Sequence, residues 1–190
     1  MIAGLVLAAG AGERFGGRKQ LAELDGRPLL EHVLAAMAAA GLDRVVVALG
    51  AHADEVLDAV DLHGAEPVVC DGWDEGIGAS LRAGAAALSD AEAIVVALGD
   101  QPHLSPEAVR RVVAARGGGA HAVRATYGGV PGHPVLIERA LFPRLGAVAG
   151  DRGAGAFLDD APVREVACDG LGSASDVDTQ AALRDLAGRQ

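Results

Sequence analysis

Short apolar runs alternate with longer segments of helical periodicity along the first two thirds of the chain. Residues 2–8 form a nearly continuous apolar run that ends close to glycine, which is typical of a buried parallel strand. Similar runs predict strands at 44–50, 65–70 and 93–100. The segments that follow them predict helices at about 28–40, 52–60, 76–88 and 106–116. This alternation predicts an α/β fold: a mostly parallel sheet with helices on both faces, in a three-layer αβα sandwich.

The pattern is looser in the last third. It predicts short strands at about 120–125, 133–137 and 163–167, and a turn-rich loop at 127–132. Short helices are predicted at about 138–143 and 153–159, with a last helix from about Thr179. Repeats and low-complexity linkers are absent from the sequence, so we expect a single domain over residues 1–190.

Ligands of open α/β sheets bind beyond the carboxyl ends of the strands. The predicted strands place three segments at that edge. These are the loop after Ala8, the segment after Cys70 and the residues after Leu98.

Composition limits the partners of the chain. A net charge of −10 argues against a nucleic-acid duplex or an anionic membrane as the main partner. Cys70 and Cys168 lack metal-ligand spacing, so we expect both to be reduced. The sequence starts without a signal-peptide pattern and has no apolar run near the ~20 residues that span a bilayer. We therefore expect a soluble, cytoplasmic protein.

The stretch "LAAGAGERFGGRKQ", residues 7–20, carries the first chemical signal, because it combines four glycines with Lys19, the only lysine of the chain. The dinucleotide fingerprint G-x-G-x-x-G fails by one residue, and the Walker A pattern fails because Gln20 follows the lysine. A purely structural glycine turn stays possible but leaves the basic residues Arg14, Arg18 and Lys19 unexplained. A loop that binds a nucleoside triphosphate explains them, with Arg14 on the outer phosphates and Lys19 as a compact charge at the α-phosphate.

The same stretch resembles the L-A-A-G-x-[SG]-x-R-x-G-x-x-K signature of small nucleotidyltransferases, in particular members of the molybdenum cofactor pathway. "LGDQP", residues 98–102, is similar to the molybdenum cofactor cytidylyltransferase family. The resemblance implies a Rossmann-like, glycosyltransferase-A-type fold of the nucleotide-diphospho-sugar transferase type. It also implies nucleotide contacts from Leu7, Ala8, Ala9, Gly10, Ala11, Gly12, Arg14 and Lys19.

Two aspartates are candidates for a metal site. Asp100 directly follows a predicted buried strand, where a carboxylate either holds Mg²⁺ (or Mn²⁺) together with substrate phosphates or begins a turn before Pro102. The resemblance implies Asp178, in "SDVDT", as the second ligand, although Asp178 is also a good N-cap for the last helix. Asp176 is the weaker candidate.

Later motifs extend the resemblance along nearly the whole chain. In "WDEGIGASLRAG", residues 73–84, it implies base contacts from Gly78, Ser80 and neighbouring backbone, with helix capping by Ser80 as the alternative. "GHPVLI", residues 132–137, implies His133 on the acceptor side, where a structural histidine is the alternative. Arg152, in "GDRGAGAFL", is a candidate contact to an anionic acceptor.

The resemblance implies transfer of CMP from CTP to the phosphate of the molybdopterin-bound molybdenum cofactor, with release of pyrophosphate. Lys19, Arg14 and Asp100 are then the catalytic residues, and transient contact with a molybdoenzyme is implied. A guanylyltransferase that uses GTP is an alternative, because only Ala9 distinguishes this loop from the L-A-G-G of guanylyl-transferring relatives. A sugar-phosphate nucleotidyltransferase is another alternative. A cofactor-binding chaperone without transferase activity is the alternative from a different class.

Overall fold

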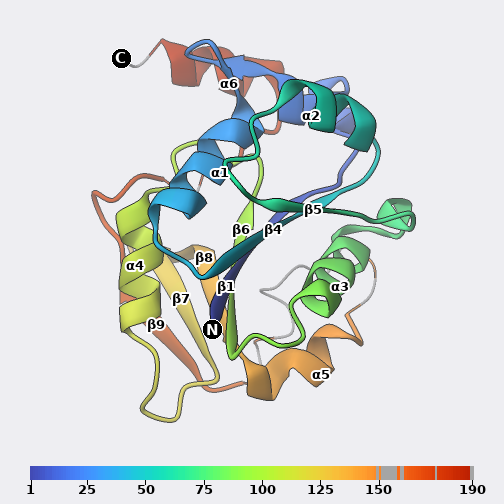
Figure 1. Cartoon of the computed structure of the whole chain (residues 1–190). Coiled ribbons are helices and arrows are strands. Elements are labelled where there is room, and N and C mark those ends of the chain that lie inside the picture. Colours follow the sequence, from blue (N-terminus) through green and yellow to red (C-terminus); the bar gives the residue numbers. More distant parts are fainter. Residues whose placement is uncertain (149, 151–157, 159–160, 174, 189–190) are drawn as a thin grey trace.

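The computed structural model describes residues 1–148, 150, 158, 161–173 and 175–188. A sheet in the order β5-β4-β1-β6-β8-β7-β9 crosses the molecule (Figure 1). Its strands are β1 (Ile2–Ala8), β4 (Arg44–Leu49), β5 (Glu66–Val69), β6 (Ala93–Leu98), β7 (Ala122–Tyr127), β8 (Val130–Glu138) and β9 (Val163–Ala167). A small hairpin, β2 (Glu23–Leu24) and β3 (Arg27–Pro28), forms a second sheet.

The helices lie where the periodicity predicts them. They are α1 (Leu29–Ala39), α2 (Ala53–Ala59), α3 (Ile77–Ala87), α4 (Pro106–Ala114), α5 (Phe142–Leu145) and α6 (Gln180–Ala187). Ser105 caps α4 by accepting a hydrogen bond from the Glu107 amide at 3.2 Å. The helix predicted at 153–159 lies outside the described residues, apart from Leu158.

Parallel pairing holds everywhere in the large sheet except at β8, which is antiparallel to β6 and β7. The prediction of a loop at 127–132 is mostly wrong, because β7 continues to Tyr127 and β8 begins at Val130. Gly128 and Gly129 alone make the turn, with φ of 58° and 77°. Two successive residues with positive φ suit the twist of a tight hairpin, so the glycines shorten the loop.

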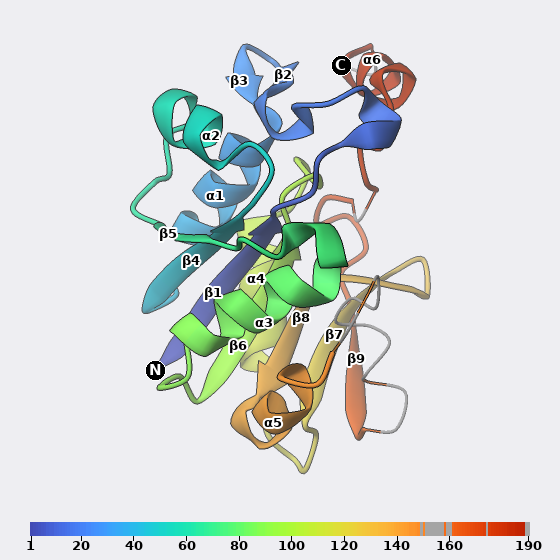
Figure 2. The same cartoon turned by 90° about the vertical axis from the view of Figure 1, so that its right-hand side faces the viewer.

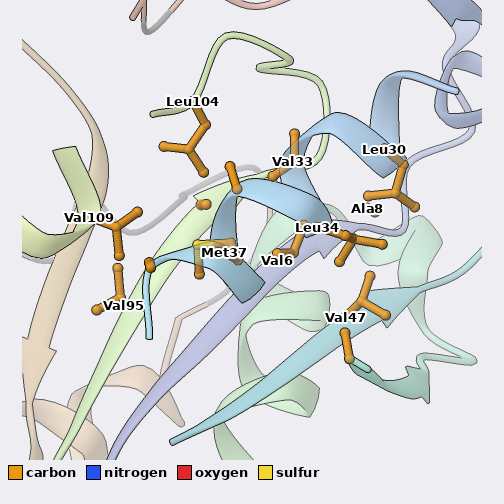
Figure 3. Close-up of a cluster of buried hydrophobic side chains, with 14 of the residues drawn as sticks. Val6, Ala8, Leu30, Val33, Leu34, Met37, Val47, Val95, Leu104 and Val109 are labelled. Carbon is orange, nitrogen blue, oxygen red and sulfur yellow. The ribbon is translucent and has the colours of Figure 1, made fainter. Parts of the chain in front are cut away.

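The helices cover both faces of the sheet (Figure 2), as predicted. On one face, α1 presents Leu30, Val33, Leu34 and Met37 to the strands, a spacing that lines one side of a helix. Figure 3 shows these side chains above Val6 of β1, in the same cluster as Val109 of α4. On the other face, α3 and α5 pack in a second cluster. Burial of each such side chain contributes about 1.5–3 kcal/mol, so the two clusters fix the layers.

The register of the central strands creates a common edge. Leu7 of β1 lies beside Ala48 of β4 and Leu98 of β6, so the chain leaves all three strands at the same level. Above that edge, α6 packs its Leu183 and Leu186 against a small cluster that contains Phe15. The end of the sheet is thus lined by loops that come from distant parts of the sequence.

Within the described residues, none of the helices is long and apolar enough to cross a bilayer. Cys70 and Cys168 are both buried and free, as expected from their spacing.

Candidate active site

A cavity of about 700 Å³ lies at the carboxyl edge of the sheet. All three segments that the strand pattern places at this edge contribute to it, and so does the segment before α6. Its lining residues are Leu7, Ala8, Ala9, Gly10, Ala11, Gly12, Glu13, Arg14, Phe15, Lys19, Gln20, Trp73, Asp74, Gly76, Ile77, Ser80, Leu98, Gly99, Asp100 and Asp178. The nucleotide contacts implied between Leu7 and Lys19 therefore all face one cavity.

The glycine-rich loop is a tight turn organised around one carbonyl. The amides of Phe15, Gly16 and Gly17 all donate to the carbonyl oxygen of Gly12, at 2.9, 3.0 and 2.9 Å. Gly12, Gly16 and Gly17 have φ of 71°, 98° and 95°, a region that residues with a side chain rarely adopt. These three amides are thus engaged inside the loop and are not available to a ligand.

Gln20 fixes this loop to the end of β1. Its buried carboxamide donates to the carbonyl of Ala8 at 2.9 Å and to that of Gly10 at 2.7 Å. This role of Gln20 is not predictable from the sequence, where its only signal is a polar residue directly after the sole lysine. Because Gln20 and Lys19 share one 3-10 turn, η2 (Lys19–Leu21), Gln20 also fixes the backbone of Lys19.

Lys19 joins the two predicted metal ligands. Its Nζ donates to Asp100 Oδ2 at 2.6 Å and to Asp178 Oδ1 at 3.1 Å. Arg14 contacts the other oxygen of Asp178, Nη1 to Oδ2, at 3.0 Å. Only 16% of the Lys19 side chain is exposed, against 79% of Arg14, so the lysine is the enclosed cation of the site.

The charges around Lys19 keep it protonated. Burial disfavours an ammonium ion and by itself lowers its pKa, but the charges and hydrogen bonds of Asp100 and Asp178 outweigh burial. The pKa of Lys19 therefore lies above its usual value.

Backbone pairing brings Asp178 close to Asp100, although the two residues are 78 positions apart in the sequence. The amide of Val177 donates to the carbonyl of Asp100 at 3.0 Å, and Leu104 forms a bridge with Gly172. The cap of α6 is Thr179, whose hydroxyl accepts from the Ala182 amide at 3.1 Å, so the capping alternative for Asp178 is wrong.

The carboxylates suit a hard divalent ion. Asp100 Oδ1 is enclosed and has no hydrogen-bond partner in the described part of the chain. In those same residues, no three His, Cys, Asp or Glu side chains group as a metal site. Asp100 and Asp178 thus offer two oxygen ligands, and Mg²⁺ ordinarily completes such a pair with substrate phosphates and water.

Asp176 is engaged elsewhere. It accepts a hydrogen bond from Gln101 Nε2 at 2.7 Å and does not line the cavity. Burial, together with the nearby charges of Asp100 and Asp178, raises its pKa against the opposing effect of Gln101.

Ser80 and Gly78 lie in different settings. Ser80 is a buried residue inside α3 and lines the cavity, while Gly76 holds the N-cap position, so the capping alternative for Ser80 is wrong. The amide of Gly78 donates to the carbonyl of Gly150 at 3.0 Å, and Gly78 does not line the cavity.

The basic and acceptor-side candidates are not all in the cavity. Arg18 is turned toward α2, where it pairs with Glu55 at 2.9 Å. His133 lies next to the cavity lining, close enough to feel the charge of Asp100, and its Nε2 is enclosed without a partner among the described residues. Burial lowers the pKa of His133 to about 4, against the opposing charge of Asp100, so the ring is neutral near pH 7. Arg152 lies outside the described residues.

The stretch 73–84, which the resemblance implies near the base, also supplies Trp73, Asp74 and Ile77 to the lining of the cavity. Trp73 is the only tryptophan of the chain. Its fluorescence therefore reports on ligands of this cavity.

A glycine turn, an enclosed lysine and paired carboxylates at the carboxyl ends of parallel strands define a nucleotidyltransferase type of site. Residues 4–166 match the MobA-like NTP transferase domain, and the chain belongs to this family.

Two named relatives cover nearly the whole chain. The nicotine blue oxidoreductase of Paenarthrobacter nicotinovorans is 37% identical over 189 residues, which make up 94% of this chain and 92% of that protein. The crystal structure of Rv0371c from Mycobacterium tuberculosis H37Rv superposes with a TM-score of 0.84 at 34% identity, over 98% of this chain and 97% of that one. A structure of Rv0371C in complex with manganese gives a TM-score of 0.82 at 33% identity, covering 100% and 99% of the two chains.

Proposed function

We propose that this protein transfers CMP from CTP to the terminal phosphate of molybdopterin that carries molybdenum, and releases pyrophosphate. The observation that carries the proposal is the enclosed Lys19 between Asp100 and Asp178, facing a cavity lined by the glycine-rich loop. A nucleotidyltransferase needs such a lysine and carboxylate pair beside its nucleotide, because negative charge develops at the α-phosphate during attack.

In the proposed reaction, an oxygen of the acceptor phosphate attacks the α-phosphorus of CTP in line. The new bond joins that oxygen to the α-phosphorus, and the bond from the α-phosphorus to the oxygen bridging to the β-phosphorus breaks. Pyrophosphate leaves with the bonding electrons. Positioning and electrostatics supply the catalysis, so a nucleophilic side chain is not required.

The chain contributes fixed charges to this reaction. Lys19 stabilises the charge on the α-phosphate, and Arg14, which is exposed at the cavity mouth, holds the outer phosphates. Asp100 and Asp178 hold Mg²⁺ or Mn²⁺, which neutralises charge on the phosphates when bound. The manganese complex of Rv0371C supports a divalent ion in this fold.

The acceptor side lies toward His133. Its neutral ring lies near Asp100, and its enclosed, unpartnered Nε2 could bond to an acceptor phosphate only if the neighbouring residues moved apart. We also propose Arg152 for this side, a location in the cytoplasm, and a passing contact with the molybdoenzyme that receives the product.

Ala9 supports CTP over GTP. It lines the cavity, and guanylyl-transferring relatives usually have glycine at this place in the loop. A GTP-dependent guanylyltransferase and a transferase acting on a sugar phosphate are the neighbouring alternatives, and a carrier that binds the cofactor without transfer is the third.

One assay separates these candidates: pyrophosphate release with each of the four nucleoside triphosphates, Mg²⁺ and molybdopterin. Release that is fastest with CTP supports the proposal, and release that is fastest with GTP selects the guanylyltransferase. Efficient release with a sugar phosphate in place of molybdopterin would select the sugar-phosphate transferase instead. The absence of release with every nucleotide and either acceptor would support the carrier.

The relative named nicotine blue oxidoreductase favours a second candidate function, a redox reaction on nicotine blue. Its test is the bleaching of nicotine blue by this protein, with NADH and NADPH as trial electron donors. Bleaching without any pyrophosphate release would replace the transferase by a reductase.

A further inference from the structure

The two carboxylates at the cavity already share one cation that belongs to the protein. The Lys19 ammonium lies 2.6 Å from Asp100 Oδ2 and 3.1 Å from Asp178 Oδ1. These are the side chains that hold the divalent ion in the proposed function, on which this inference rests. An ammonium and a metal ion cannot both occupy the place between the same two oxygens.

We propose that Lys19 is an internal counter-cation that competes with the divalent ion for Asp100 and Asp178, so that the ion binds tightly only together with the nucleotide. Phosphates of the incoming nucleotide attract the ammonium away from the carboxylates. The carboxylates are then available to the metal, and the ammonium lies at the phosphates. One exchange of partners thus couples metal binding to the placement of the catalytic charge.

Electrostatics favours such an exchange. Two neighbouring carboxylates repel each other, and an enclosed cation between them is strongly stabilised where the surroundings screen little. A divalent ion binds carboxylate oxygens at about 2.0–2.1 Å and brings twice the charge, so it repels an ammonium at the same oxygens. The metal therefore meets a barrier in the free protein that the nucleotide removes.

The local architecture lets the side chain move without the loop. Gln20 fixes the backbone of this turn through its bonds to Ala8 and Gly10. The four-carbon stem of Lys19 is flexible, and its charge is compact. The amino group can therefore change partners by side-chain rotation, while the glycine-rich turn keeps its shape.

Arg14 provides a built-in comparison. It also contacts Asp178, at 3.0 Å, but 79% of its side chain is exposed. Solvent screens such a pair, so Arg14 competes weakly with a metal ion. A variant that removes the charge of Arg14 is therefore the matched control for one that removes the charge of Lys19.

The test is Mn²⁺ binding to the full chain without nucleotide, measured from the electron paramagnetic resonance signal of free Mn²⁺. We expect Lys19→Met to bind Mn²⁺ at least about tenfold more tightly than the unaltered protein, because two carboxylates lose their cation. Arg14→Met should change the affinity less than about threefold. Asp100→Asn combined with Lys19→Met should abolish the gain.

Thermal unfolding gives a second readout and a check on folding. Lys19→Met should be less stable than the unaltered protein without metal, and Mn²⁺ should raise its Tm by more than it raises that of the unaltered protein. If Lys19→Met does not fold, Lys19→Gln, which keeps a hydrogen-bonding group, takes its place in both measurements.

Two outcomes would overturn the proposal. One is equal Mn²⁺ affinity in the unaltered protein and Lys19→Met. The other is tight binding of Mn²⁺ to the unaltered, nucleotide-free protein that Asp100→Asn removes. Adding CTP distinguishes failure of this inference from failure of the proposed function. If CTP strengthens Mn²⁺ binding equally in both proteins, the nucleotide–metal site stands and only the competition is wrong.

Discussion

Lys19 lies where two demands on a side chain coincide. It neutralises Asp100 and Asp178 in an enclosed place beside the cavity, and in the proposed function it also has to reach an α-phosphate there. Arginine would meet the first demand with a broad, planar fork, but a compact charge on a flexible stem serves both. The 15 other Lys and Arg residues of the sequence are all arginine.

Lys19→Ala should lower kcat by about 10²–10³, because the contact to the α-phosphate strengthens in the transition state. The affinity for CTP, followed by Trp73 fluorescence, should change far less. Single-turnover rates at saturating CTP measure the first quantity. A large loss of CTP affinity with unchanged turnover of bound substrate would contradict the assigned role.

His133 makes stability depend on pH. Its pKa is about 4 in the folded protein and ~6.5 when unfolded, so the unfolded chain binds the additional proton between these values. The free energy of unfolding should therefore fall as the pH decreases, by about 2 kcal/mol between pH 7 and pH 5 from this group.

Urea unfolding at the two pH values measures this loss. His133→Gln has no group that titrates in the window, so its free energy of unfolding should fall by correspondingly less. Equal losses in the two proteins would show that His133 is not buried in its neutral form.

Among the secondary-structure elements, the segment between β9 and α6 decides whether the site is complete. It runs beside residues 100–104 through the bridge from Leu104 to Gly172 and through the bond from Val177 to Asp100. Gly172 has φ of 92°, and a Cβ atom there would overlap the carbonyl oxygen of His103. We therefore expect the close approach of the two backbones at Gly172 to help position Asp178.

Gly172→Ala should destabilise the fold by about 2–3 kcal/mol, because a strained φ is combined with a clash against backbone. Gly170→Ala is the matched control, since Gly170 also has positive φ but open space around the Cβ position. It should cost only about 1 kcal/mol.

The two variants should also differ at the site. Gly172→Ala should weaken Mg²⁺-dependent CTP binding, which Trp73 fluorescence measures, while Gly170→Ala should leave it close to normal. Equal effects of the two substitutions on CTP binding would show that the close approach does not position Asp178.

On the scale of the whole molecule, the cavity is lined by residues from near both ends of the sequence. Its walls come from the first strand, the central strands and the segment before the last helix, so a ligand in it contacts elements that are far apart in the sequence. Such a ligand stabilises the folded state by mass action.

CTP with Mg²⁺ at about 100 times its Kd should add ~2.7 kcal/mol, which raises Tm by about 5–10 °C in a domain of this size. Differential scanning calorimetry measures the shift. In Asp100→Asn, the part of the Tm shift that depends on Mg²⁺ should be lost. The other nucleoside triphosphates should raise the Tm of the unaltered protein by less than CTP does. An unchanged Mg²⁺ dependence in Asp100→Asn would remove this carboxylate from the metal site.

Much of the fold follows from local patterns. Buried parallel strands require continuous apolar runs, and helices require apolar residues at helical spacing, so their positions and the layers were predictable. The hairpin at Gly128 and Gly129 was not, because a glycine pair is equally compatible with a loop. The antiparallel insertion of β8 between β6 and β7 depends on pairing partners that local patterns do not contain.

The sequence by itself determined which chemistry is present: a glycine turn with one lysine, an aspartate after a strand end and further aspartates before the last helix. Only the tertiary structure decided how these groups are paired, because strand register and the close approach at Gly172 bring distant residues together. It turned Arg18 toward Glu55, engaged Asp176 with Gln101, and placed Lys19 between Asp100 and Asp178. Which charged groups pair depends on the distance between them and on their burial in the folded protein. The spacing of residues along the chain gives neither quantity.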